Sequence, residues 1–188
     1  SNTTFTSNVE DLTKAAQALA ARDLAPALLI GHSLGGAAVL KAAGQIGGIK
    51  AVVTLGAPFA PDHVTHNFAD KLDEITRDGS AEVNLGGRTF TIGRDFVEDI
   101  RAESLKPAIR DLHAALLVMH APRDAVVGID NAESIFRAAK HPKSFVTLDD
   151  ADHLISRGED AEYAASVIAA WAERYLDLGS AETTEAVP

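Results

Sequence analysis

The possible folds of this chain are limited above all by a short apolar run that ends in a glycine-rich turn around one serine. Residues 27–30 read Ala-Leu-Leu-Ile, and residues 31–36 continue as Gly-His-Ser-Leu-Gly-Gly. The apolar run predicts a strand buried on both faces, and the small residues at 37–43 predict a helix packed close to it. A serine at such a junction projects its hydroxyl above the sheet, as in a nucleophile elbow.

Each residue of the predicted elbow receives a role. The strained backbone at Ser33 requires small residues two positions before and after it, and Gly31 and Gly35 meet that requirement. We expect His32 to pack under Ser33, and the backbone N–H of Leu34 to face an oxyanion at the positive end of the following helix. A plain glycine-rich turn is the alternative interpretation. The position of these residues between a predicted strand and a predicted helix favours the elbow.

Apolar runs alternate with helical patterns along the rest of the chain. Further strands are predicted at residues 51–55, 114–119 and 144–148, and helices at residues 8–22, 129–139 and 160–176. Ser7 and Glu10 form a capping-box pattern for the first helix. This alternation predicts an α/β fold, with a parallel sheet flanked by helices.

One segment, residues 61–111, interrupts the alternation. It holds a charged helical stretch at 64–76 and a hairpin pattern at 83–91. We interpret it as a lid-like insertion over the site, with a solvent-facing excursion as the alternative. The small and acidic residues 179–188 read as a tail or linker, so residues 1–178 form the predicted domain.

A serine nucleophile needs a histidine base and an acid that orients the histidine. In parallel α/β sheets, functional loops follow the carboxyl ends of strands, which directs attention to Asp124 and His153. The order Ser33, Asp124, His153 is that of α/β hydrolases. Asp130 is the rival acid, although its place at the start of a helix explains it by helix-end electrostatics.

Other charged and ionisable residues receive simpler explanations. We interpret Asp149, Asp150 and Asp152 as a solvated loop, with an orienting role toward His153 as the alternative. None of the histidines has metal-ligand spacing, so neither a metal nor another cofactor is expected.

The composition argues against several classes of binding partner and bears on the cellular compartment. A chain of 188 residues with 46% hydrophobic residues is long enough for one buried core. Its net charge of −10 argues against binding to nucleic acid or to anionic lipid, and no apolar run is long enough to span a membrane. The absence of cysteine removes thiol chemistry and is compatible with the predicted cytoplasmic location.

The residues at 31–36, His-Ala-Pro-Arg-Asp at 120–124 and Asp-His at 152–153 together resemble the α/β-hydrolase superfamily. Segments 127–132 and 141–146 are similar to the hydrolase half of bacterial α/β-hydrolase/OsmC-like fusion proteins. The resemblance implies an esterase-like hydrolase. It also implies that the family's first strands and a second oxyanion donor would precede Ser1, making this the C-terminal part of the domain.

The sequence thus predicts a serine hydrolase that acts on a small-molecule ester, amide or thioester through an acyl-enzyme. The alternative is a catalytically silent hydrolase fragment that serves as a binding or assembly module. Without the first strands, the strand at 27–30 would have an open edge. We therefore expect either a homodimer or pairing with an N-terminal segment.

Overall fold

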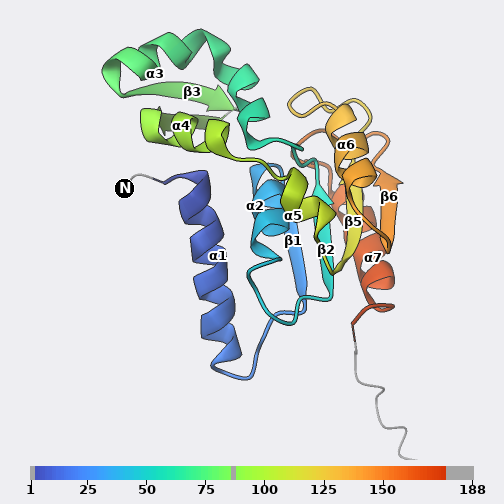
Figure 1. Cartoon of the computed structure of the whole chain (residues 1–188). Helices are drawn as coiled ribbons and strands as arrows, with labels where there is room; N and C mark the ends of the chain where they lie inside the picture. Colours follow the sequence, from blue (N-terminus) through green and yellow to red (C-terminus); the bar gives the residue numbers. More distant parts are fainter. Residues whose placement is uncertain (1–2, 86–87, 177–188) are drawn as a thin grey trace, which may run out of the picture.

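Four parallel strands form the central sheet of the computed structural model, which describes residues 3–85 and 88–176. They lie in the order β1-β2-β5-β6, and all three pairings are parallel. Their bounds are Leu28–His32, Ala51–Leu55, Ala115–His120 and Lys143–Thr147. The predicted α/β class is confirmed. Because the strands are parallel, their carboxyl ends all lie at the same end of the sheet (Figure 1).

Helices cover both faces of this sheet. Alternate strand residues such as Val52 and Leu116 pack in one apolar cluster with α1 (Phe5–Ala20), α2 (Leu34–Ala42) and α6 (Asp130–Ala138). The intervening residues, including Val53 and Leu117, pack against α7. This last helix spans Gly158–Ala172. The two-residue period of the strands therefore divides the core into two layers.

The first strand differs from its prediction in one respect. β1 lies at the edge of the sheet, and Ile30 is 50% exposed. The expectation of a strand buried on both faces is wrong here, because the described residues place no strand beyond β1 and α7 does not cover Ile30. β2 and β5, which are central, are buried along their whole length.

The insertion after β2 is more structured than its sequence pattern indicated. It comprises η1 (Pro61–Lys71), α3 (Leu72–Asp78), the antiparallel strands β3 (Ser80–Leu85) and β4 (Arg88–Gly93), α4 (Arg94–Ala102) and α5 (Lys106–Arg110). The hairpin prediction is confirmed, with Val83 opposite Phe90. The helical stretch predicted at 64–76 is confirmed, but it is divided between η1 and α3, and the backbone leaves helical geometry at the buried Phe68. The helices α4 and α5 were not predicted from the sequence.

The insertion shares its core with the helices beside it. Val97 and Ile100 of α4 belong to the same buried cluster as Phe5 and Val9 of α1. Asp99 accepts hydrogen bonds from the backbone N–H and the hydroxyl of Thr6, at 2.8 and 2.6 Å. Figure 1 shows the insertion next to the amino-terminal ends of α1 and α2, toward the end to which the strands point.

The first helix begins one turn earlier than predicted. Thr4 is its N-cap and forms a capping box with Ser7, in place of the predicted pair Ser7 and Glu10. Phe5 is fully buried, and its burial favours the extra turn. The predicted tail at 179–188 lies outside the described residues.

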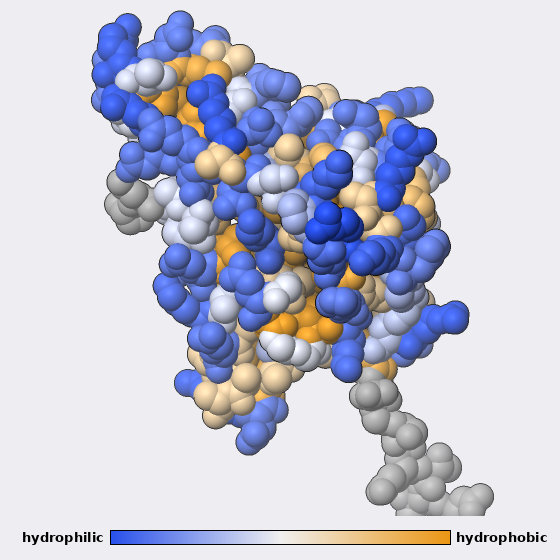
Figure 2. All heavy atoms as spheres, in the orientation of Figure 1, coloured by the Kyte–Doolittle hydropathy of each residue, from blue (hydrophilic) through white to orange (hydrophobic). Residues whose placement is uncertain are grey.

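Polar side chains cover most of the face seen in Figure 2. Apolar surface on this face is confined to separate patches. Within residues 3–85 and 88–176, no helix is long and apolar enough to cross a membrane.

Candidate active site

The serine of the predicted elbow lies between β1 and α2 in a strained backbone conformation. Ser33 has φ 53° and ψ −128°, a region that non-glycine residues seldom adopt. Its backbone N–H donates to the carbonyl of Leu55 on the neighbouring strand at 2.8 Å. The turn therefore holds the serine at the carboxyl end of β1.

The steric demand of this turn falls on two glycines, one of which was not predicted. A Cβ on Gly31 would lie 2.3 Å from the carbonyl oxygen of Gly35, so residue 31 must be glycine. A Cβ on Gly35 would meet no described atom within 4 Å, and the expected steric need for a small residue there is wrong. The close approach occurs one residue later, where a Cβ on Gly36 would lie 2.6 Å from Cβ of Ala57.

Three side chains from the loops after β1, β5 and β6 form a continuous hydrogen-bonded chain. Nε2 of His153 lies 3.0 Å from Oγ of Ser33, and Nδ1 lies 2.7 Å from Oδ2 of Asp124. An ionised carboxylate only accepts hydrogen bonds, so Nδ1 carries the proton and Nε2 presents its lone pair to the serine hydroxyl. This is the tautomer that a general base beside a serine requires.

The acid of this chain is buried and well supplied with donors. The Asp124 side chain is 1% exposed, and its Oδ1 accepts from the backbone N–H groups of Val126 and Val127 at 2.8 and 2.9 Å. Burial acts to raise the pKa of Asp124, but the hydrogen bonds from His153, Val127 and Val126 outweigh it and hold the pKa below its ordinary value. The group is therefore ionised at neutral pH.

Asp130 and the acidic residues that precede His153 lie outside this hydrogen-bonded chain. Asp130 is exposed at the first residue of α6, and the carboxylate that reaches His153 belongs to Asp124. Asp149 and Asp150 are exposed, as expected of a solvated loop. Asp152 accepts from the backbone N–H of Ser156 at 2.8 Å, a bond that lowers the pKa of Asp152. It thus stabilises the turn that carries His153.

Sequence reasoning missed a glycine that lies against the pair of His153 and Asp124. Gly56 follows β2 and has φ +55°. A Cβ at this position would come within 3.3 Å of Asp124 Oδ2 and 3.4 Å of His153 Nδ1. A glycine directly after a buried strand was the available signal, but its neighbours come from distant parts of the chain.

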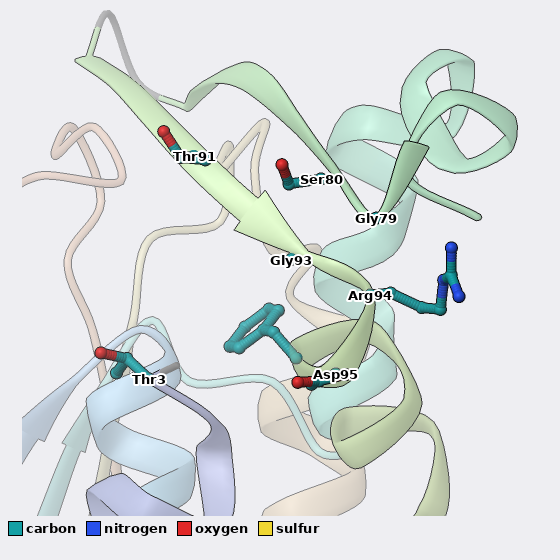
Figure 3. Close-up of a pocket in the computed structure, with 8 residues that line it drawn as sticks. Thr3, Gly79, Ser80, Thr91, Gly93, Arg94 and Asp95 are labelled. Atoms are coloured by element: carbon teal, nitrogen blue, oxygen red, sulfur yellow. The ribbon is translucent and has the colours of Figure 1, made fainter. Parts of the chain in front are cut away.

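Two hollows lie near the amino-terminal end of α1. Figure 3 shows the larger one, of about 510 Å³, beside the hairpin, where Thr3, Ser80 and Thr91 line it and the Arg94 side chain extends away. Residues of the hydrogen-bonded chain do not line this hollow. The second, of about 400 Å³, lies between α1 and α2 and reaches Leu34 and Gly35, next to Ser33. Among the described residues, no cluster of three or more His, Cys, Asp or Glu side chains has the arrangement of a metal site.

A parallel sheet flanked by helices, with a histidine-paired serine at a strand-to-helix junction, defines the α/β-hydrolase class of proteins. Residues 1–167 match the α/β hydrolase family, and the chain belongs to that family. It is accordingly a hydrolase. A search of curated proteins finds no match to the sequence.

Solved structures agree with this assignment. The esterase domain of a Rhodothermus marinus protein is 47% identical, with a TM-score of 0.76, and the match covers 93% of this chain and 70% of that one. A putative hydrolase from Agrobacterium vitis S4 has 20% identity and a TM-score of 0.72, with 89% and 68% covered. A Paleococcus ferrophilus monoacylglycerol lipase has 18% identity and a TM-score of 0.72, with 93% and 77% covered. The last two share the fold with this chain.

Proposed function

We propose that this hydrolase cleaves an ester bond of a small molecule through an acyl-enzyme formed on Ser33. The observation that carries the proposal is the chain of hydrogen bonds from Ser33 through His153 to Asp124, at 3.0 and 2.7 Å. These distances lie within the reach required of a nucleophile and its base. The esterase domain from Rhodothermus marinus, at 47% identity, supports the ester as substrate class.

The proposed reaction follows from the position of each proton. The Ser33 oxygen attacks the acyl carbon while its proton passes to Nε2 of His153, and a tetrahedral oxyanion forms. The histidine then gives this proton to the departing alkoxide, which leaves as an alcohol. Water attacks the acyl-enzyme by the same route in reverse, releasing a carboxylic acid and returning the proton to Ser33.

Two groups stabilise the charges that develop in this reaction. Asp124 is ionised and accepts from Nδ1 of His153, so it favours the imidazolium that forms during attack. Leu34 is the first residue of α2, and its N–H has no partner within the helix. We assign this N–H as one oxyanion donor, at the positive end of the helix dipole.

Active-site labelling tests the nucleophile. A fluorophosphonate probe is expected to label the wild-type protein and a Ser80→Ala control, and to leave Ser33→Ala unlabelled. Turnover of p-nitrophenyl acetate should fall by about a million-fold in Ser33→Ala, as for other triad serines. Equal labelling of the wild-type protein and Ser33→Ala would overturn the assignment.

The same assay separates the enzyme from a silent binding or assembly module. A folded wild-type protein that neither takes up the probe nor hydrolyses p-nitrophenyl acetate would favour the module. Parallel assays with a p-nitroanilide and a thioester compare the three bond types. We expect the ester to be cleaved faster than the anilide, because its oxygen leaving group departs more readily than an amide nitrogen.

We further propose kinship with the hydrolase half of α/β-hydrolase/OsmC-like fusions, on the strength of segments 127–132 and 141–146. OsmC-like domains act as peroxidases through cysteines, and the proposal does not extend to that activity because this chain has no cysteine. Sequencing the gene downstream of the codon for Pro188 tests this kinship. A reading frame that continues into an OsmC-like domain supports it, and an immediate stop codon contradicts it.

A further inference from the structure

Two histidines outside the proposed triad lie at the carboxyl ends of strands beside it. His32 ends β1 and immediately precedes Ser33, and it is partly buried. His120 ends β5, four residues before Asp124, and is 1% exposed. Neither imidazole has a role in the proposed proton transfer, so their contacts call for a separate explanation.

The His32 ring connects the elbow to the loop of the proposed base. Its Nε2 lies 2.6 Å from the backbone carbonyl oxygen of His153. A carbonyl only accepts, so Nε2 of His32 carries the proton. The two rings also pack against each other, with centroids 5.0 Å apart. Because His32 and Ser33 are adjacent in the chain, this bond fixes the separation between the nucleophile and the backbone of the base.

The His120 ring connects the end of β5 to the loop that carries the proposed acid, Asp124. Its Nε2 donates to the backbone carbonyl of Val127 at 2.8 Å, and the N–H of Val127 donates to Oδ1 of Asp124. His120 Nε2 lies 3.7 Å from Oδ2 of Asp124, which is too long for a hydrogen bond. The ring therefore acts on the carboxylate through the loop rather than by direct contact.

The two loops are held by local turns, such as the one that Asp152 closes with Ser156, and they lack regular secondary structure. Residues 121–129 and 148–157 contain turns and bends instead of helix or strand. The second loop also includes Ile155 at φ 52°, a strained conformation for a β-branched residue. A neutral imidazole can donate one hydrogen bond to such a loop without the desolvation cost of burying a charge.

We propose that His32 and His120 are positioning residues, each donating Nε2–H to a loop carbonyl so that His153 and Asp124 stay aligned with Ser33. The proposal rests on the proposed serine-hydrolase function. Neither ring contacts the reacting atoms in the proposed mechanism. Loss of either bond should therefore reduce kcat and leave KM nearly unchanged, whereas a substrate contact would change KM.

Paired substitutions test the hydrogen bond separately from the bulk of the ring. Leucine at position 32 or 120 removes the donor, and glutamine restores an N–H near the position of Nε2. We expect kcat for p-nitrophenyl acetate and the rate of fluorophosphonate labelling to fall by up to about a hundredfold in His32→Leu and His120→Leu, the cost of a misplacement of about 1 Å. His32→Gln and His120→Gln should recover most of the loss. His113→Leu, at an exposed histidine, is the matched control.

A second readout does not depend on turnover. The proton shared by His153 and Asp124 gives a low-field NMR resonance in a well-aligned pair, and it should persist in the glutamine variants and broaden or vanish in the leucine variants. If a leucine variant fails to fold, the asparagine variant at that position replaces it, because its shorter amide cannot reach the carbonyl.

The outcomes distinguish this proposal from the function on which it rests. Leucine or asparagine variants that fold and retain wild-type kcat, labelling rate and resonance would overturn the positioning role while the serine-hydrolase assignment stands. Glutamine variants as impaired as the leucine variants would also overturn it. If the wild-type protein itself takes up no probe, the proposed function fails and the positioning role falls with it.

Discussion

At the scale of single residues, the absence of a side chain at Gly56 is as important to the candidate site as the side chains around it. The histidine and carboxylate pack so closely over Gly56 that a methyl group would contact both. Its positive φ of 55° adds backbone strain for any other residue. Gly56 therefore allows the Asp124 and His153 side chains to meet over the end of β2.

We expect Gly56→Ala to lower kcat for p-nitrophenyl acetate by less than the roughly hundredfold cost of a misplacement of about 1 Å, because the added methyl displaces the pair of His153 and Asp124 by only a few tenths of an ångström. Steady-state kinetics measures this, with Gly47→Ala as control, since a Cβ at Gly47 would meet no described atom within 4 Å. A Gly56→Ala protein with wild-type kcat would show that the pair tolerates the displacement.

The lowered pKa of Asp124 predicts how acid acts on the fold. A carboxyl group whose pKa is lower in the folded than in the unfolded state stabilises the fold above its ordinary value of 3.8. That contribution is lost as the pH falls through the lowered folded value. Below about pH 4, the free energy of unfolding should therefore fall more steeply for the wild-type protein than for Asp124→Asn.

Urea unfolding at a series of pH values from neutral to acid checks this expectation. The two proteins share every other titrating group, so the difference between their curves reports on Asp124 and on its hydrogen-bonded partner His153. Parallel curves below pH 4 would mean that the carboxylate gains nothing from its hydrogen bonds in the folded state.

At the scale of elements, α4 fastens the insertion to the rest of the domain. It buries Val97 and Ile100 in the core shared with α1, and its Asp99 caps the start of α1 through Thr6. Lys41 of α2 and Glu103 form an ion pair at 2.7 Å nearby. Partly exposed ion pairs contribute little, so the apolar contacts of α4 should dominate this attachment.

Truncating the α4 contact should destabilise the protein substantially. Ile100 is fully buried, and Ile100→Ala is expected to cost about 2–5 kcal/mol of unfolding free energy through lost burial and a residual cavity. Chemical denaturation measures the change. Glu98→Ala, on the exposed side of α4, is the control and should change stability by less than about 0.5 kcal/mol.

At the scale of the whole molecule, the open edge of β1 stands out on a chain with a net charge of −10. Net charge of this size opposes self-association. The outer edge of β1, however, pairs with no other strand among the described residues and exposes Ile30, so it offers backbone groups and apolar surface to another chain. The homodimer and the pairing with an N-terminal segment, both expected from the sequence, would each use this edge.

We expect Ile30→Lys to reduce self-association, because a lysine at an edge strand opposes pairing with another strand. Sedimentation velocity over a range of concentrations measures the effect. Leu24→Lys is the matched control, since Leu24 is 63% exposed but lies outside the strand. The same concentration dependence in both variants and the wild-type protein would argue against association through β1.

Features that depend on near neighbours in the chain could be predicted from the amino-acid sequence. The apolar run before Gly31, the strained turn at Ser33 and the alternation of strands with helices follow from local spacing and conformational preference. These patterns were enough to predict the parallel sheet and to direct attention to the loops that carry Asp124 and His153. The preference for Asp124 over Asp130 rested on position alone.

Features that depend on residues far apart in the chain became visible only in the folded structure. Ser33 and His153 are 120 positions apart in the chain. They come within 3.0 Å because the parallel strands that precede them end on the same side of the molecule. The closeness of Gly56 to this pair and the exposure of Ile30 likewise depend on which strands become neighbours. A local pattern carries no information about these contacts, because each depends on packing between segments that the chain brings together only on folding.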